Sequence, residues 1–199
     1  EALRESEERF HLVTRAAKIG TYQRNLKTGK DYWSPEFLEI YGLNPGDKLP
    51  LQDGIPAAIH PDDHKRVLKE ANNRLRRVSS PDFNTEHRII MPSGDIRWVL
   101  IRGKMEFDKE NNPAGTYGIV MDITDRKKTE NKLYQQEKLL QEILDQMPSG
   151  VSIAEAPSGK LLYHNKEAVR IIRHPLLETE NYKGYVQYGA HHDEKTPYN

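Results

Sequence analysis

The 199-residue sequence contains no cysteine. Disulfide bonds, thiolate metal sites, a cysteine nucleophile and a flavin bonded through cysteine are therefore excluded within it. A net charge is missing as well, because 30 Lys and Arg residues balance 30 Asp and Glu residues. A neutral chain lacks the attraction that draws basic proteins to nucleic acids and anionic membranes, so we expect neither partner.

Long apolar runs are also absent. The longest, such as residues 99–101, fall far short of the roughly 20 residues that a membrane-spanning helix needs. No segment has the pattern of a secretory leader either. Apolar residues make up 36% of the chain, below the usual share of about 45–50%. We therefore expect small domains with much wetted surface in a cytoplasmic protein.

An internal repeat is the most informative feature that the sequence does contain. Over about the first forty positions, five pairs of residues are identical at one constant offset: Leu3 and Leu133, Glu7 and Glu137, Gly20 and Gly150, Gly29 and Gly159, and Lys30 and Lys160. The matches follow an apolar helical stripe, a glycine and a turn, which indicates a repeated unit of helix, strand, turn, strand and helix. The second copy ends at Asn199, so we expect one whole domain followed by the front of another.

Hydrophobic periodicity and turn signals predict an α+β domain over residues 19–124. We expect strands at residues 19–26, 31–33, 83–91, 96–107 and 114–123, and helices at residues 35–41 and 61–78. Strands and helices that occur in runs rather than in alternation favour an antiparallel sheet with helices over one face. An amphipathic linker helix, residues 1–18, is expected to precede this domain.

From Asp125 onward the chain is helical and highly charged. Leu133, Leu140 and Met147 recur every seven residues, which favours a self-pairing or dimerising helix over residues 125–147. The alternative is a single amphipathic helix that lies on its own domain.

Several motifs resemble those of the PAS domain with its PAC motif, over about residues 10–133. They are Gly118 to Lys127 (GIVMDITDRK), Ser34-Pro35 with Tyr41-Gly42, His60 to Asp63 (HPDD), Glu86 to Arg88 (EHR), and Ser93 to Val99 (SGDIRWV). His87 departs from the pattern, because this family has an aromatic residue there. The stretch 147–151 and the helix start at Asn165 resemble the beginning of a second such domain.

The resemblance implies a five-stranded antiparallel sheet with helices on one face and often a small cavity. It assigns residues 19–124 to a PAS sensor domain, 125–147 to a signalling helix and 148–199 to a partial second PAS domain. It also implies a homodimeric sensory module of a histidine kinase, with the output domain outside this chain. A ligand-free dimerisation or relay module of a diguanylate cyclase or a transcriptional regulator is the alternative.

Candidate site residues follow from this resemblance and from residue type. Large or charged side chains that could line a ligand pocket are Trp33, Phe37, Tyr41, Phe83, Glu86 and Trp98. Polar residues at the end of the last strand, Asp122 and Thr124 with Ile123 between them, are expected to anchor the sheet to the signalling helix. Glu86 and Arg88 share one face of a strand. They could form a ligand clamp, but cross-strand pairing with a neighbour such as Arg97 or Arg102 is favoured.

Metal and catalytic sites have less support. His60 and His64 lie four residues apart at a helix start, which could present two zinc ligands and defines a metal-dependent enzyme as a second alternative. A helix-capping cluster without metal is favoured there. We expect a solvated loop at residues 191–194, no haem, and no catalytic residue, because no phosphate loop or catalytic triad pattern is present. A non-covalent flavin or a small organic acid remains open as the ligand.

Overall fold

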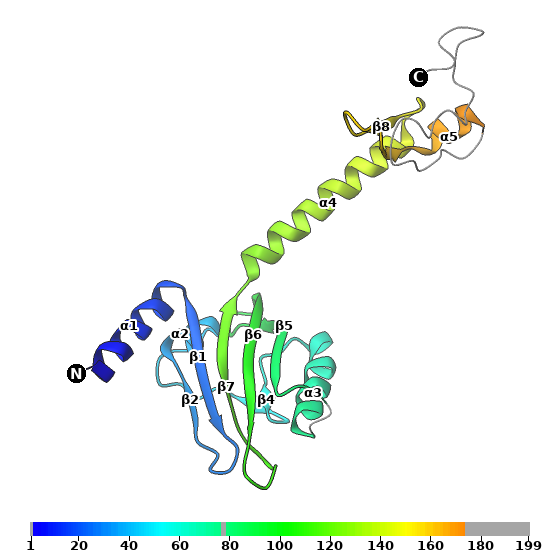
Figure 1. Cartoon of the computed structure of the whole chain (residues 1–199). Helices are drawn as coiled ribbons and strands as arrows, with labels where there is room; N and C mark the ends of the chain where they lie inside the picture. Colours follow the sequence, from blue (N-terminus) through cyan, green and yellow to red (C-terminus); the bar gives the residue numbers. More distant parts are fainter. Residues whose placement is uncertain (1, 77–78, 174–199) are drawn as a thin grey trace, which may run out of the picture. The chain divides into compact units, whose positions relative to one another are not determined.

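A computed structural model describes residues 2–76 and 79–173 of the chain, so residues 191–194 lie outside its described part. The chain divides into two compact units after Thr129, and each is described by itself (Figure 1). In the described residues, no helix is both long and apolar enough to cross a membrane.

The first unit is built on a five-stranded antiparallel sheet, as predicted. Its strands are β1 (Ile19–Asn25), β2 (Asp31–Trp33), β5 (Asp82–Ile90), β6 (Ile96–Phe107) and β7 (Pro113–Asp122). They lie in the order β2-β1-β7-β6-β5 (Figure 1). The first and last strands along the chain are therefore neighbours, with Gly20 opposite Val120. The end of β7 leads directly into α4 (Thr124–Gln146).

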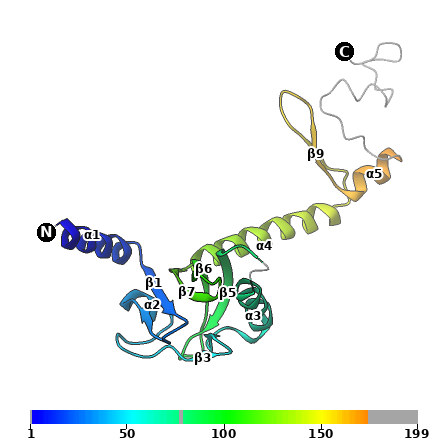
Figure 2. The same cartoon turned by 60° about the horizontal axis from the view of Figure 1, so that its bottom comes forward.

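Three helices and a short hairpin complete the first unit. They are α1 (Ala2–Ala16), α2 (Pro35–Ile40), α3 (Pro61–Leu75), and the pair β3 (Leu51–Gln52) and β4 (Ile55–Pro56). Figure 2 shows α2 and α3 beside the sheet. Ser34 starts α2 because its hydroxyl accepts a hydrogen bond from the Phe37 amide at 3.2 Å. The two-residue strands were not predicted from sequence, because they are too short to show an alternating pattern.

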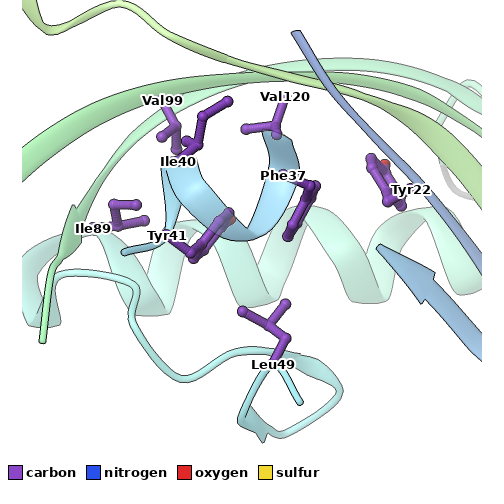
Figure 3. Close-up of a cluster of buried hydrophobic side chains, with 8 residues drawn as sticks. All are labelled: Tyr22, Phe37, Ile40, Tyr41, Leu49, Ile89, Val99 and Val120. Atoms are coloured by element: carbon purple, nitrogen blue, oxygen red, sulfur yellow. The ribbon is translucent and has the colours of Figure 1, made fainter. Parts of the chain in front are cut away.

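The core lies between α2 and the sheet (Figure 3). Phe37 and Tyr41 are each 1% exposed, and their rings stack with centroids 4.8 Å apart. Val99 and Val120 contribute fully buried side chains from the sheet. Gly20 allows α2 to approach β1, because a Cβ at this position would collide with the Phe37 Cα.

The second unit contains the rest of α4 and a hairpin with a helix. The hairpin strands are β8 (Ser152–Ala154) and β9 (Leu161–His164), and α5 (Lys166–Ile172) follows them. Asn165 starts α5, because its side-chain oxygen accepts a hydrogen bond from the Ala168 amide at 2.9 Å.

Candidate ligand cavity and helix junction

A cavity of about 210 Å³ lies in the first unit, beside the core. Most of its lining is aromatic or aliphatic: Tyr22, Leu26, Trp33, Phe37, Ile55, Pro56, Ile59, Val67, Ala71, Leu75, Phe83, Ile101 and Met105. The cavity is smaller than the pockets of about 300–1,000 Å³ that hold drug-sized ligands. Its size and lining therefore suit a small, largely apolar molecule.

Three of the six predicted pocket residues line this cavity, namely Trp33, Phe37 and Phe83. The other three do not. Tyr41 is buried in the core against Phe37. Glu86 and Trp98 lie on the opposite face of the sheet, because side chains alternate along a strand and their neighbours face the core.

His87 is the most unusual residue of the lining. It is 1% exposed, and neither of its ring nitrogens has a hydrogen-bond partner among the described residues. Burial, assisted by the nearby Arg66 charge, lowers the pKa of His87 to about 4. The imidazole is therefore neutral near pH 7 and offers one donor and one acceptor to the cavity.

Two guanidinium groups line the cavity, one from β1 and one from α3. Arg24 on β1 forms an ion pair with Asp31, with 3.2 Å between Nε and Oδ1. Arg74 on α3 lies over the Phe83 ring, 4.4 Å from its centroid, and burial lowers the pKa of Arg74. Desolvation likewise raises the pKa of Tyr22 to about 12. None of these three polar residues was predicted from sequence, because the helix and strand patterns around them contain no motif that indicates a binding site.

The start of α3 is held to the edge strand β5 by the Arg88 guanidinium, which pairs with Asp63 at 3.0 Å and with Asp62 at 3.3 Å. Asp63 accepts hydrogen bonds from the Arg88 backbone amide at 2.9 Å and from its guanidinium at 3.0 Å. The expected cross-strand pairing with a neighbour such as Arg97 or Arg102 is therefore wrong, because Arg88 pairs with α3 and Glu86 pairs with Arg126 and Lys127 of α4. Side chains of neighbouring elements, rather than of the next strand, supply the partners.

The His60 ring also serves this helix start. Its Nδ1 accepts a hydrogen bond from the Asp62 amide at 3.3 Å, which makes it the helix cap. His64 lies in the first turn, with its Nε2 buried. Within residues 2–76 and 79–173, no three His, Asp or Glu side chains cluster where they could hold a metal ion.

The junction between β7 and α4 is held by a chain of polar contacts. The Asp122 carboxylate accepts a hydrogen bond from the Thr124 amide at 2.8 Å and pairs with Arg97 at 3.1 Å. Arg97 also donates to the Ile40 carbonyl at 2.7 Å, at the end of α2. Thr124 in turn accepts a hydrogen bond from the Trp98 amide at 3.0 Å. The same few residues therefore connect α2, β6, β7 and α4.

A second group of contacts holds the first turn of α4 on the outer face of the sheet. Glu86 pairs with Arg126 at 2.6 Å and with Lys127 at 2.7 Å. The Lys127 ammonium lies 5.4 Å from the centre of the Trp98 ring, and the Arg88 guanidinium lies 5.7 Å from it. Glu86 and Trp98 thus belong to the junction, and they contact the helix rather than the cavity.

The heptad residues of the helix are exposed within the single chain. Leu133 and Leu140 expose 56% and 58% of their surface, and Met147, just beyond the end of α4, exposes 39%. No residue of α4 is buried. Each of these apolar side chains is therefore available to a further surface.

Comparison with known proteins agrees with this architecture. A family model described as the PAS fold matches residues 30–120. A blue-light-activated histidine kinase of Brucella ovis is 28% identical over 189 residues, which cover 90% of this chain and 37% of that protein. The blue-light-activated histidine kinase of Brucella anthropi is 30% identical over 125 residues, covering 63% of this chain and 24% of that protein. The chain therefore spans well under half the length of these curated relatives.

Among solved structures, a sensory box histidine kinase/response regulator from Burkholderia thailandensis is similar to this chain. Its sequence is 35% identical, the TM-score is 0.56, and the match covers 67% of this chain and 98% of that one. An antiparallel five-stranded sheet with helices and a small cavity defines a class of sensory α+β modules. The chain belongs to the PAS family within that class.

Proposed function

We propose that this chain is the sensory part of a two-component histidine kinase, which relays the state of its cavity through α4. The observation that carries the proposal is the course of β7. This strand contributes Thr116 to the cavity lining, ends at Asp122, and continues through the polar junction into α4. A change in the cavity can therefore reach the helix along one strand.

The proposed relay works by shifting a balance between two arrangements of the junction. Occupation of the cavity moves β6 and β7, which carry Arg97 and Asp122. Their ion pair and the Asp122 hydrogen bond to the Thr124 amide then set the position of the first turn of α4. The helix delivers this change to an output domain outside the chain.

The nature of the parent protein is also part of this proposal. The similar proteins from Brucella and Burkholderia are histidine kinases, which supports a histidine kinase as the parent. A cytoplasmic kinase whose catalytic residues lie outside this segment is what we propose. The two curated relatives are described as activated by blue light. Since the 199 residues of this chain include no cysteine, a cysteinyl flavin cannot form within it. A diguanylate cyclase or a transcriptional regulator is the alternative parent.

A second PAS domain is proposed to begin in the second unit. In the first unit, Ser34 Oγ accepts hydrogen bonds from the amides of Thr21 and Phe37. In the second, Asn165 Oδ1 accepts hydrogen bonds from the amides of Val151 and Ala168, both at 2.9 Å. In both units, one side chain thus bridges the helix start to a residue in the first strand or directly before it.

The glycines of the repeat support the same assignment. A Cβ on Gly150 would lie 2.9 Å from the Ala168 Cα, as one on Gly20 would crowd Phe37. Gly29 and Gly159 both occupy turns with positive φ, at 69° and 75°. Tight packing and turn geometry thus recur at equivalent positions.

Homodimerisation through α4 is the proposed use of its exposed stripe. Leu133 and Leu140 follow the seven-residue spacing of a coiled-coil seam. The double variant Leu133→Gln/Leu140→Gln should shift the chain from dimer to monomer in sedimentation equilibrium. An unchanged mass distribution would contradict this interface.

The relay is tested by placing residues 1–146 before the catalytic region of a histidine kinase with a measurable autophosphorylation rate. Asp122→Ala should change this rate at least severalfold and leave the domain folded. Asp125→Ala is the matched control, because the Asp125 side chain is 99% exposed. Equal rates for Asp122→Ala and the unmodified hybrid would overturn the relay.

A further inference from the structure

The cavity lining includes a cation that no carboxylate contacts within the described residues. The charged groups of the lining are two guanidinium groups, Arg24 and Arg74, and one carboxylate, Asp53. Arg24 is already paired with Asp31, and it donates a hydrogen bond of 2.6 Å to the Gly54 carbonyl in the same turn as Asp53. In the described part of the chain, Arg74 forms no ion pair, and its contact is the Phe83 ring.

The carboxylate nearest in sequence to Arg74 is engaged elsewhere. Glu70 lies one turn earlier on α3, where it pairs with Arg66 at 3.0 Å and accepts a hydrogen bond from the Thr85 hydroxyl at 2.8 Å. Glu70 therefore contributes to the field at Arg74 without contacting it. A partly desolvated guanidinium is stabilised by an anion that it can contact directly.

His87 supplies a second polar feature of the cavity. Both ring nitrogens are buried and have no hydrogen-bond partner in residues 2–76 and 79–173, and a partner for either would stabilise the imidazole. His87 and Phe83 are four residues apart on β5 and face the same side of it. This spacing separates their Cα atoms by about 13 Å. Arg74 lies on the Phe83 ring. Arg74 and His87 therefore mark two ends of one apolar cavity.

We infer that the cavity binds a small organic monocarboxylate, with its carboxylate on Arg74, its apolar body along Phe83 and Ile101, and a hydroxyl or carbonyl group at the far end on His87. This inference rests on the proposed sensory function and specifies the ligand class for it. The body is short, because the cavity has a volume of only about 210 Å³.

An aromatic acid substituted at the para position has these features, and it supplies the probes. Para-hydroxyphenylacetate carries both polar ends, phenylacetate lacks the hydroxyl group, and para-hydroxyphenylacetamide lacks the charge. Each is titrated into the purified full chain and followed by calorimetry. We expect the hydroxylated acid to bind most tightly and the amide to bind at least about tenfold more weakly, since a hydrogen bond to a charged group contributes more than a neutral one.

Two substitutions assign the ends of the ligand. Arg74→Gln should weaken binding of the acid about 10- to 100-fold and leave binding of the amide unchanged, while Arg74→Lys should retain part of the affinity. His87→Phe should weaken binding of the hydroxylated acid and leave phenylacetate unchanged. The matched control is Arg102→Gln, because Arg102 lies on the exposed outer face of β6 and does not line the cavity.

The outcomes separate this inference from the proposed sensory function. Equal affinity for acid and amide, or an unchanged affinity in Arg74→Gln, would show a cavity that does not select an anion. Dissociation constants above about 1 mM for both acids would also overturn the monocarboxylate. Neither result affects the relay, which is judged separately by autophosphorylation of the hybrid carrying Asp122→Ala.

Discussion

Arg97 and Asp122 form an ion pair of 3.1 Å that connects the end of α2 to the start of α4. Both side chains are partly exposed, at 29% and 37%, so the pair contributes little to global stability by itself. Its importance lies in position, because Asp122 also accepts a hydrogen bond from the first amide of the helix. A contact of small energy can therefore decide how the helix begins.

Replacing Asp122 with Ala should loosen the first turn of α4 more than it destabilises the domain. The variant loses a capping hydrogen bond and a surface ion pair, together about 1 kcal/mol of unfolding free energy. Hydrogen exchange should show faster exchange at the amides of Thr124 to Lys127. Asp125→Ala, which removes an exposed carboxylate one residue into the helix, should leave these rates unchanged. If both variants exchange alike, Asp122 does not hold the junction.

Glu86 should hold the same turn through its charge. Glu86→Gln removes a partner of Lys127 and Arg126, whose hydrogen bonds lower the pKa of Glu86, and should reduce stability by about 0.5–1 kcal/mol. The difference between variant and parent should shrink as salt concentration rises, because exposed ion pairs are screened. Glu110→Gln, in the exposed β6–β7 turn, is the matched control. A difference that is independent of salt would exclude an electrostatic contribution.

Asp63 should make the protein sensitive to strong acid. Hydrogen bonds from Arg88 lower the pKa of Asp63 to about 2 from 3.8. A carboxyl group whose pKa falls on folding stabilises the native state above its unfolded pKa, and this stability is lost as pH falls from about 4 to about 2. Asp63→Asn should lower the free energy of unfolding by about 1–2 kcal/mol at neutral pH. The variant should also lose less stability than the parent as pH falls from about 4 to about 2.

The adjacent Asp62 is the matched control, because its side chain is 70% exposed and reaches Arg88 at 3.3 Å. Asp62→Asn should still lose stability as pH falls from about 4 to about 2, as measured by urea unfolding at several pH values. The role assigned to Asp63 would be refuted if the stability of the parent did not change between pH 4 and 2. It would also be refuted if the stability of Asp62→Asn depended on pH as little as that of Asp63→Asn.

His87 should make the stability of the protein depend on pH in a higher range than Asp63 does. Its pKa falls from 6.5 to about 4 on folding, so the unfolded chain binds more protons between these values and stability decreases as pH falls through this range. His87→Phe should remove that slope and raise stability at neutral pH by about 1–3 kcal/mol, because two unsatisfied buried nitrogens disappear. Thermal unfolding at several pH values measures both effects.

His87→Gln separates the two causes of this prediction. Glutamine does not titrate, so the slope should disappear as in His87→Phe. Its buried amide still needs hydrogen bonds, so the gain in stability at neutral pH should be absent. A parent protein whose stability is constant between pH 6.5 and 4 would contradict a neutral, desolvated imidazole.

The local features of this protein follow from its sequence. Strand β6 is predicted at residues 96–107 and observed at Ile96–Phe107, because alternating side chains and strong turns bound it on both sides. The helix starts at Ser34 and Asn165 are also confirmed. Such features depend on residues within a few positions of each other, so a short stretch of sequence determines them.

Only the tertiary structure decided which distant side chains meet. Glu86 and Arg126 are 40 positions apart in the chain, and no local pattern indicates that β5 and α4 bring them together. The cavity likewise combines Arg74 of α3 with His87 of β5. Sequence periodicity shows which side of an element is apolar, whereas the packing of whole elements determines what each polar side chain faces. For that reason the fold was predictable from sequence, while the partners of Glu86, Arg88 and Arg74 were not.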